Sequence, residues 1–412
     1  MPGPLSHLRV LDLSRVLAGP LAGQHLADMG ADVIKVERTG TGDDTRAWAP
    51  PFVAEPSDGD PGLSAYFMAA NRGKRSLAVD LTQDEGAALV RTLAAKADVI
   101  LENFKVGGLV KYRLDYDSVR ATNPSVVYCS ITGFGQDGPY ATRAGYDFLV
   151  QGMGGLMSIT GDTDAAGGEP MKVGVAIADQ ISGLNALTGV LAALVRRERT
   201  GEGERIDVAL LDSTIGALAN QSATFHATGQ APGRMGNAHP TVVPYQVFKT
   251  ADGHIILAVG NDGQFARFCE VGGLDHVAAD HRYTTNAGRI INRETLIPEL
   301  ERTFLKRTSA DWIASLEAAS VPCGPINTID EVFADDQVQA RQMQRHLEAP
   351  RLGHVAVTAN PIRLASHDTT HAGAPPRLGQ HTRDVLRGEL GFDDHTISDL
   401  AERDIIQVWP RA

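Results

Sequence analysis

The sequence has few cysteines, and none of them has the spacing of a metal site. Among its 412 residues only Cys129, Cys269 and Cys323 are cysteines, and they lie far apart without a CxxC pair. This scarcity argues against a disulfide framework and a zinc site, and it is typical of proteins in a reducing compartment. We therefore expect no bound metal.

Long apolar runs and a basic excess are also missing. The apolar-rich stretch from Val173 to Val195 is interrupted by Asp179 and Asn185, so no run of 18 apolar residues predicts a membrane span. The N-terminus lacks the basic region and apolar core of a signal peptide. Asp and Glu outnumber Lys and Arg by 50 to 38, and a net charge of −12 disfavours nucleic-acid binding. The sequence predicts a soluble, cytoplasmic protein with no membrane or nucleic-acid partner.

The sequence also lacks the common hydrolase, kinase and metalloprotease motifs, but its first 150 residues alternate regularly between apolar runs and helical patterns. Helices are predicted over residues 20–30 and 84–96. The predicted strands cover residues 8–13, 31–36, 76–81, 98–101 and 125–131. Strands and helices in this alternation predict an α/β fold with an open, mostly parallel, Rossmann-like sheet.

Changes in composition divide the rest of the chain. Residues 39–63 are rich in Gly, Pro and Asp and predict a long loop, whereas residues 174–199 predict a long helix. From about 225 to 325 the chain becomes rich in Gly, Pro and His and includes a hairpin pattern with an Asp-Gly turn. We therefore expect a large domain over 1–200, a linker over 201–224 and a smaller α+β domain over 225–325.

Basic residues gather near the ends of the predicted strands. In an open α/β sheet the ligand crevice lies beyond the carboxyl ends of the strands, where several cations suit a polyphosphate. The alternative is that each of these side chains is an ordinary solvated surface charge. The residues in question are Lys35, Arg38, Arg72, Lys74, Arg75, Lys105 and Lys111, together with the neutral Asn103.

One carboxylate lies among apolar residues. Asp179 occurs in VGVAIADQISGLNAL, near the start of the long predicted helix. It is either part of an exposed helix stripe or a partly desolvated functional group, and a position near the helix start favours its negative charge.

Ten motifs in a fixed order resemble one family. They begin with LDLSRVLAGPLAGQHLADMGADVIKVER, RGKRSLAVDL, ADVILENFKVG and SITGFGQDGPY, and continue with AGYDFLVQGMGG, GEPMKVGVAIADQISG, GEGERIDVALLDS, GNAHPTVVPYQVF, VPCGPINTIDEV and PPRLGQHT. In this order they resemble the class III coenzyme A transferases, the family of formyl-CoA transferase and carnitine CoA-transferase. The resemblance implies an interlocked homodimer and makes residues 326–412 a return segment that completes the large domain.

The resemblance implies that Asp179 is the catalytic nucleophile, forming an aspartyl–acyl anhydride and then an aspartyl–CoA thioester. It implies acyl-CoA and a small carboxylic acid as substrates, most closely succinyl-CoA and a dicarboxylate. The implied coenzyme A contacts are Val16, Leu17, Ala18, Arg38, Val79, Asp80, Leu81, Asn103, Phe104, Lys105, Lys111, Arg143 and Tyr146. The implied substrate contacts are Trp48, Tyr66, Asp147 and His239.

Two further regions receive roles from the resemblance. Residues Gly233 to His239 match a loop that covers the active site in the family, although they lack its run of consecutive glycines. A dicarboxylate also needs a partner for its far carboxylate, and the candidates are Arg46, Arg234 and His239.

One position separates two reactions of the family. The related α-methylacyl-CoA racemases carry AGHD, whereas this chain has Tyr146 in AGYD. A tyrosine with an ordinary pKa of about 10 is a poor base at neutral pH, so we expect a transferase. The alternatives are a 2-methylacyl-CoA racemase or epimerase that uses Asp179 as acid and base, and a non-catalytic CoA-binding subunit.

Overall fold

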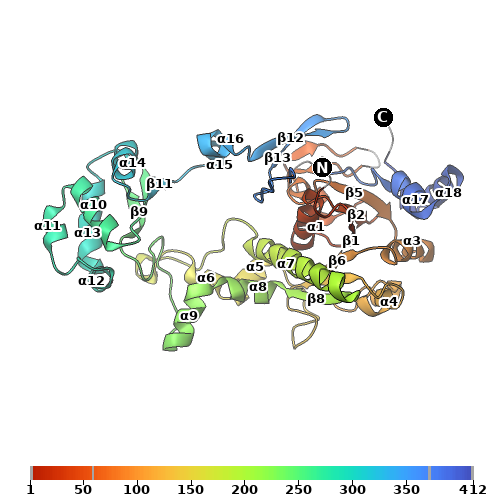
Figure 1. Ribbon diagram of the computed structural model, residues 1–412, viewed down its shortest axis with the longest axis horizontal. Coiled ribbons are helices and arrows are strands. Elements are labelled where there is room, and N and C mark those ends of the chain that lie inside the picture. Colours follow the sequence, from red (N-terminus) through yellow and green to blue (C-terminus); the bar gives the residue numbers. More distant parts are fainter. Residues whose placement is uncertain (1–2, 58–59, 370–372, 410–412) are drawn as a thin grey trace. The chain divides into compact units, whose positions relative to one another are not determined.

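A computed structural model describes residues 3–57, 60–369 and 373–409. The chain divides into two compact units (Figure 1). Unit 1 comprises residues 1–156, 173–223 and 336–412, and unit 2 comprises 157–172 and 224–335. The domain limits expected from sequence stay a prediction.

A seven-stranded sheet forms the centre of unit 1. Its order is β14-β5-β2-β1-β6-β7-β8, and every pair is parallel except β14 with β5. The mixed α/β fold with a mostly parallel sheet therefore agrees with the sequence prediction. The strands are β1 (Arg9–Asp12), β2 (Asp32–Glu37), β5 (Lys74–Val79), β6 (Val99–Glu102), β7 (Val127–Thr132), β8 (Glu204–Ala209) and β14 (Ile406–Gln407).

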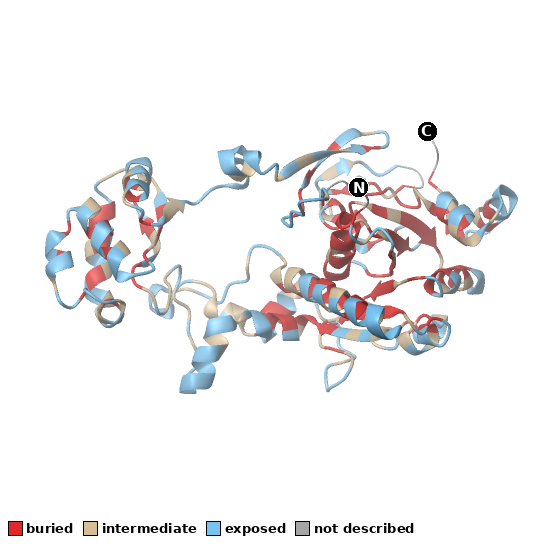
Figure 2. Cartoon of the chain, viewed as in Figure 1, coloured by how far each residue is buried: buried red, intermediate tan, exposed pale blue. Residues whose placement is uncertain are grey.

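Alternate residues of the central strands enter two cores, one on each face of the sheet. In β1, Val10 packs with α1 (Ala18–Asp28) and α7 (Ile177–Thr200), whereas Leu11 packs with α3 (Asp84–Ala94) and α17 (Thr382–Leu390). Strands buried on both faces have few polar residues, which explains the uninterrupted apolar runs. In Figure 2 the central strands are red, that is, buried. The helices of unit 1 are α1 (Ala18–Asp28), α2 (Ala65–Met68), α3 (Asp84–Ala94), α4 (Tyr116–Arg120), α5 (Asp147–Met153), α7 (Ile177–Thr200), α8 (Leu210–Ala217), α16 (Asp336–Ala340), α17 (Thr382–Leu390) and α18 (Asp394–Glu402).

The strand order reverses between β1 and β6. From β1 the chain proceeds to β2 and β5 on one side, and then returns to place β6 on the other side of β1. At such a switch point the loops after neighbouring strands separate and leave a crevice at the carboxyl edge. The segments that follow β1 and β6 are therefore the first place to look for a ligand site.

The region predicted as a loop over 39–63 contains short regular elements. A 3₁₀ turn, η1 (Asp44–Ala47), is followed by paired strands β3 (Phe52–Ala54) and β4 (Leu63–Ser64). Asp43 accepts a hydrogen bond from the Thr45 amide at the start of η1, so a side-chain cap supplies order that composition does not reveal. A second hairpin in unit 1 joins β12 (Gln344–Ala349) to β13 (Gly353–Thr358).

Helix α7 is long and apolar enough to cross a membrane by length and composition alone. A test for uninterrupted apolar runs misses it because polar residues divide the stretch. Its Ala186 and Val190 are buried in the core of unit 1, and core helices of soluble proteins pass the same test.

Unit 2 has its own sheet and core. Strands β9 (Tyr245–Lys249) and β10 (His254–Ala258) form the expected hairpin, and β11 (Cys323–Pro325) pairs with β10. Phe248 and Phe304 stack at 4.6 Å between ring centroids inside the core. Its helices are α10 (Asp262–Gly272), α11 (Asp275–Ala279), α12 (Asn286–Ile291), α13 (Arg293–Phe304), α14 (Ser309–Ala318) and α15 (Ile329–Ala334), while α6 (Leu156–Ile159) and α9 (Ala219–Thr228) lie at the boundaries between the units.

Candidate functional site

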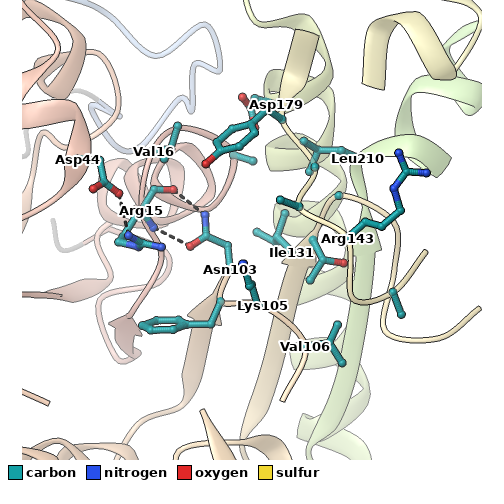
Figure 3. Close-up of a pocket in the computed structure, with 18 of the residues that line it drawn as sticks. Arg15, Val16, Asp44, Asn103, Lys105, Val106, Ile131, Arg143, Asp179 and Leu210 are labelled. Carbon is teal, nitrogen blue, oxygen red and sulfur yellow. Dashed lines mark hydrogen bonds and ion pairs between the residues drawn. The ribbon is translucent and has the colours of Figure 1, made fainter. Parts of the chain in front are cut away.

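A cavity of about 460 Å³ lies at the carboxyl edge of the sheet, beside the switch point (Figure 3). Its walls come from the segments after β1, β6 and β7, the region before α5, and the first turn of α7. In Figure 3, Asp179 lies at the top, Arg15 and Asp44 at the left, and Arg143 and Leu210 at the right. The predicted site residues that line it are Val16, Ala18, Trp48, Asn103, Phe104, Lys105, Arg143, Tyr146 and Asp179.

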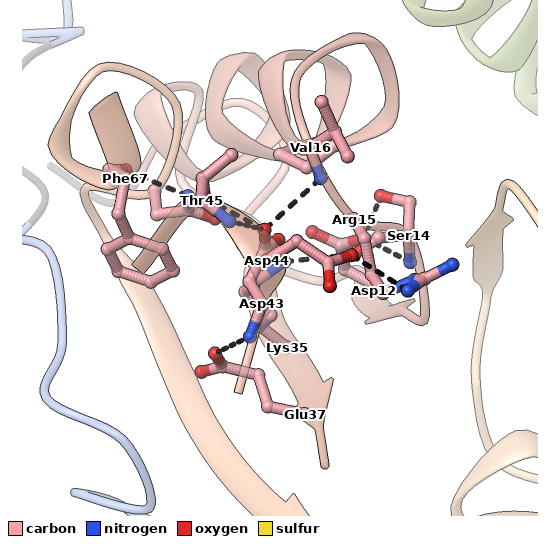
Figure 4. A network of polar contacts seen from close by, with 12 residues as sticks. Asp12, Ser14, Arg15, Val16, Lys35, Glu37, Asp43, Asp44, Thr45 and Phe67 are labelled. Carbon is pink, nitrogen blue, oxygen red and sulfur yellow. Dashed lines mark hydrogen bonds and ion pairs between the residues drawn. The ribbon is translucent and has the colours of Figure 1, made fainter. Parts of the chain in front are cut away.

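The turn after β1 is held in an unusual conformation. Val16 has a φ of 71°, a region that β-branched residues rarely adopt. Its amide donates to Asp43 at 3.2 Å, and Lys35 donates to the Ser14 carbonyl at 2.9 Å (Figure 4). The Asn103 side chain accepts from the Arg15 amide at 2.9 Å and donates to the Arg15 carbonyl at 2.6 Å. These hydrogen bonds hold the turn in its strained conformation, and the turn forms a fixed part of the cavity wall.

Two buried ion pairs stabilise the turn after β1. Lys35 pairs with Asp43 at 2.9 Å and Lys74 with Asp12 at 2.8 Å, with all four side chains excluded from solvent. Burial alone would raise the pKa of Asp43, but Lys35 and the hydrogen bonds from Thr45 outweigh it and lower that pKa to about 2. Burial lowers the pKa of Lys74 to about 8, although Asp12 opposes the change.

Several cations suggested as phosphate ligands are therefore engaged by the protein itself. Lys35 and Lys74 are buried in the pairs just described. Arg72 pairs with Asp28, and Arg75 pairs with Asp32. A phosphate would have to displace these carboxylates, so the suggestion was wrong for the four cations.

Arg46 is likewise not a free partner for a substrate carboxylate. Its side chain is fully buried, forms two hydrogen bonds with Glu37 at 2.7 and 2.8 Å, and lies 3.7 Å from the Phe67 ring centroid. That earlier suggestion fails because the guanidinium already has a carboxylate partner.

Asp179 lies in the first turn of α7. Gly183, one turn later, touches α1 so closely that an added Cβ would lie 2.7 Å from the Ala18 carbonyl oxygen. This close approach brings the Asp179 carboxylate to the Ala18 amide, which donates to it. Burial first and the charge of Asp147 second raise the pKa of Asp179 to about 7, against the opposing effect of the Ala18 hydrogen bond.

Asp147 provides the missing cap of α7. The residue before the helix, Ala176, has no capping side chain, but Asp147 Oδ1 accepts from the amides of Ala178 at 2.8 Å and Asp179 at 3.4 Å. Asp147 Oδ2 accepts from Gln151 Nε2 at 2.7 Å. Asp147 was expected to contact substrate, whereas in the structure its two oxygens contact protein donors.

A second cavity, of about 240 Å³, holds other predicted coenzyme A contacts. Arg15 and Phe104 line both cavities. Leu17 is buried at the start of α1, and exposed Lys111 packs on Tyr112; neither lines either cavity. The predicted residues that line the second cavity are Arg38, Val79, Asp80, Leu81 and Phe104.

The predicted substrate contacts fall in different places. Trp48 packs edge-on against Tyr66, with 5.0 Å between ring centroids, and burial together with Asp179 and Asp147 raises the pKa of Tyr66. His239 belongs to unit 2, where its Nδ1 accepts from the Thr241 amide and its ring lies 5.3 Å from that of Tyr245. Arg234, also in unit 2, forms an ion pair with Asp164 and so already has a carboxylate partner.

Sequence reasoning missed Arg15, Asp44 and Gln151. Arg15 lies in the turn that follows β1, so its position just beyond a strand end was a usable signal. Asp44 pairs with Arg15 at 2.8 Å across the cavity wall, and Gln151 is fully buried. No signal in the sequence marked Gln151. Across the described ranges, no group of three or more His, Cys, Asp or Glu side chains could hold a metal ion.

Comparisons with known proteins show the family of this chain. The family model described as CoA-transferase family III matches residues 5–382. The chain is 52% identical to the succinate–glutarate CoA-transferase of Agrobacterium fabrum, covering 93% of this chain and 95% of that one. It is 41% identical to the succinyl-CoA:glutarate CoA-transferase of Mus musculus, covering 98% and 90%. The crystal structure of a CAIB/BAIF family protein from Brucella suis has a TM-score of 0.83 at 47% identity, covering 94% of this chain and all of that one.

Proposed function

Because this chain belongs to CoA-transferase family III and is a CoA-transferase, we propose that it moves CoA from succinyl-CoA to a dicarboxylate such as glutarate through Asp179. One observation carries the assignment of Asp179. It is the carboxylate that lies in the cavity with a pKa raised to about 7 by burial and by Asp147. A carboxylate with little hydration loses less solvation when it attacks a carbonyl carbon.

The proposed reaction has four acyl-transfer steps. The Asp179 carboxylate attacks the succinyl thioester carbonyl, forming a mixed anhydride and releasing CoA as a thiolate. The thiolate attacks the Asp179 carbonyl, giving an enzyme–CoA thioester and free succinate. The acceptor carboxylate then attacks the carbonyl carbon of this thioester, forming a second mixed anhydride with Asp179 and releasing the thiolate. The thiolate attacks the acceptor's carbonyl carbon in this anhydride, which gives the acceptor–CoA thioester and regenerates the Asp179 carboxylate. Each step transfers an acyl group without net proton uptake or oxidation.

The geometry supports these steps in two ways. The positive end of α7 and the Ala18 amide lie at the Asp179 carboxylate, where negative charge develops in the tetrahedral intermediates. The two cavities that share Arg15 and Phe104 provide separate spaces for the acyl end and the nucleotide end of a CoA thioester. We propose that the predicted contacts lining them bind these parts of CoA, and that Trp48 and Tyr66 border the acyl group. The roles predicted for Leu17, Lys111 and His239 stay predictions.

Chemical trapping tests the mechanism. The enzyme is mixed with succinyl-CoA and treated with borohydride or hydroxylamine, and the peptide containing Asp179 is analysed by mass spectrometry. We expect a reduced residue or a hydroxamate at Asp179, and neither Asp179→Asn nor Asp179→Ala should transfer CoA although both still bind it. Absence of an adduct, together with activity in Asp179→Ala, would sink the mechanism.

The racemase alternative makes a different prediction. Tyr146 lies at the cavity with an exposed side chain, in the position where a racemase needs a base. We expect no exchange of the α-proton of a 2-methylacyl-CoA in deuterated water, and transfer from succinyl-CoA to acids in a panel of glutarate, itaconate, mesaconate and malate. Proton exchange without CoA transfer would favour the racemase, and binding without either reaction would favour a silent subunit.

Assembly and location complete the proposal. We propose an interlocked, cytoplasmic homodimer, consistent with a chain that leaves unit 1, forms most of unit 2 and returns at residue 336. Light scattering of the purified protein should give twice the 43.9 kDa mass of the chain, and a monomer would contradict the proposal.

A further inference from the structure

We propose that Gln151 is a positioning residue for Asp179, acting through Asp147 at the start of α7. This inference rests on the function proposed above and adds a residue that touches neither cavity. Gln151 lies in α5, is fully buried, and lines neither the 460 Å³ nor the 240 Å³ cavity.

Gln151 holds two parts of the chain at once. Its Nε2 donates to Asp147 Oδ2 at 2.7 Å, and its Oε1 accepts from the Val173 amide at 2.9 Å. Val173 is the residue at which the chain re-enters unit 1, four residues before α7 begins. One amide side chain therefore fixes both the orientation of Asp147 and the approach of the chain to α7.

The first turn of α7 depends on this arrangement. The Ile177 amide donates to Val175 and the Gln180 amide to Ala176, whereas those of Ala178 and Asp179 donate to Asp147. With Gln151 bonded to one oxygen, the other oxygen of Asp147 faces these two amides. Without Gln151 the carboxylate can rotate, and the two amides lose their acceptor.

Gln151 also affects the repulsion between the charges of Asp147 and Asp179. Asp147 repels the ionised Asp179 carboxylate, and this repulsion disappears when Asp179 becomes a neutral anhydride or thioester. Gln151 fixes the position from which this repulsion acts. Tyr66 from α2 interacts with both carboxylates, and Tyr146 and Arg143 line the same cavity as Asp179. The ionisable side chains of α1, His25 and Asp28, lie in its last turn and bond Asn360 and Arg72, and α8 carries Asp212 in its first turn.

Two substitutions test the inference. Gln151→Met keeps the volume but removes both hydrogen bonds, and misplacement of a reacting group lowers rates by on the order of 100-fold. We expect kcat for glutarate to fall about 10- to 100-fold while KM for succinyl-CoA changes less than about threefold, because Gln151 does not line the binding cavities.

Gln151→Glu provides a partial rescue that a purely structural residue would not show. A protonated Glu can donate to Asp147 and still accept from Val173, whereas an ionised Glu cannot donate. Because Asp179 must be ionised to act, we expect the variant to have a bell-shaped pH–rate profile, unlike the rising profile of the wild type.

The matched control is Asn123→Leu. Asn123 is a buried amide of unit 1 that donates to the carbonyls of Ala94 and Ala97 at 3.2 and 2.7 Å, away from the cavity. It should lower thermal stability without changing the pH profile or kcat. An unchanged kcat in folded Gln151→Met, or a pH profile like that of the wild type in Gln151→Glu, would overturn the inference while leaving the proposed function intact. A wild-type enzyme that forms no Asp179 adduct would instead overturn the proposed function itself.

Discussion

Replacing Asp179 with Asn should stabilise the folded protein, and the gain should depend on pH. The pKa of Asp179 rises from 3.8 to about 7 on folding, so the native state disfavours its charge. A rise of about three units corresponds to about 4 kcal/mol, and we expect about 1–3 kcal/mol because the side chain keeps some contact with solvent. The Asn side chain can still accept the Ala18 hydrogen bond, so little else changes.

The direction of the pH dependence follows from the protonation of Asp179. At pH 4 the wild-type carboxyl is largely protonated when folded, and Asn has little advantage. As pH rises through the interval from about 4 to 7, the unfolded chain ionises first, and the wild type loses stability relative to the variant. Above pH 7 the advantage of Asn is complete.

Urea unfolding of both proteins at pH 4.5 and pH 8 measures this difference. The variant should be more stable at pH 8, by more than at pH 4.5. Asp207→Asn is a suitable comparison, because Asp207 lies in the same unit within β8, accepts a hydrogen bond from the Gln136 amide, and does not line the cavity with Asp179. An equal gain at both pH values, or a loss of stability at pH 8, would refute the reasoning about desolvation.

Three further predictions concern the same region. The wild-type kcat/KM for CoA transfer should rise tenfold per pH unit well below pH 7 and level off above it, as Asp179 ionises with a pKa of about 7; a pH-independent rate from pH 5 to 8 would contradict this. Lys74→Met should lower the free energy of unfolding by about 3–5 kcal/mol in urea titrations at pH 7, because it leaves the charge of Asp12 buried without its partner. Val16→Gly should be more stable than Val16→Ala by about 1 kcal/mol in the same assay, because only Gly adopts a φ of 71° without strain, and the reverse order would show that the turn relaxes.

The central strands and helices were predictable because their signals are local. Apolar runs placed β1, β2, β5, β6 and β7 within about two residues of their observed limits. The edge strand β14 was not predicted, since it has two residues and pairs with β5 across more than 300 positions of sequence. Short elements stabilised by distant partners leave no periodic pattern in their own sequence.

The candidate site was likewise predictable where its signals are local and not where they depend on residues distant in sequence. Asp179 was predicted on its context and on the family resemblance, and the structure places it in a cavity with eight of the other predicted site residues. The cap that Asp147 gives to α7 joins residues 31 positions apart and could not be read from either segment. The strain at Val16 depends on Asp43 and Asn103, which lie in different loops.

Two sets of cations in unit 1 differ in their partners, and this difference bears on the ligand; Arg15, which lines both cavities and pairs with Asp44, belongs to neither set. The buried group bonds carboxylates of the protein: Lys35, Arg46, Arg72 and Lys74. The exposed group at or near the cavities has no ion pair among the described residues: Arg38, Lys105, Lys111 and Arg143. The buried cations shape the loops, and the anion beside each of them offsets part of the cost of burying its charge. The exposed cations have no carboxylate partner among the described residues, so their charge can attract a ligand. A protein with a net charge of −12 therefore still presents local positive charge where the proposed substrate carries its phosphates.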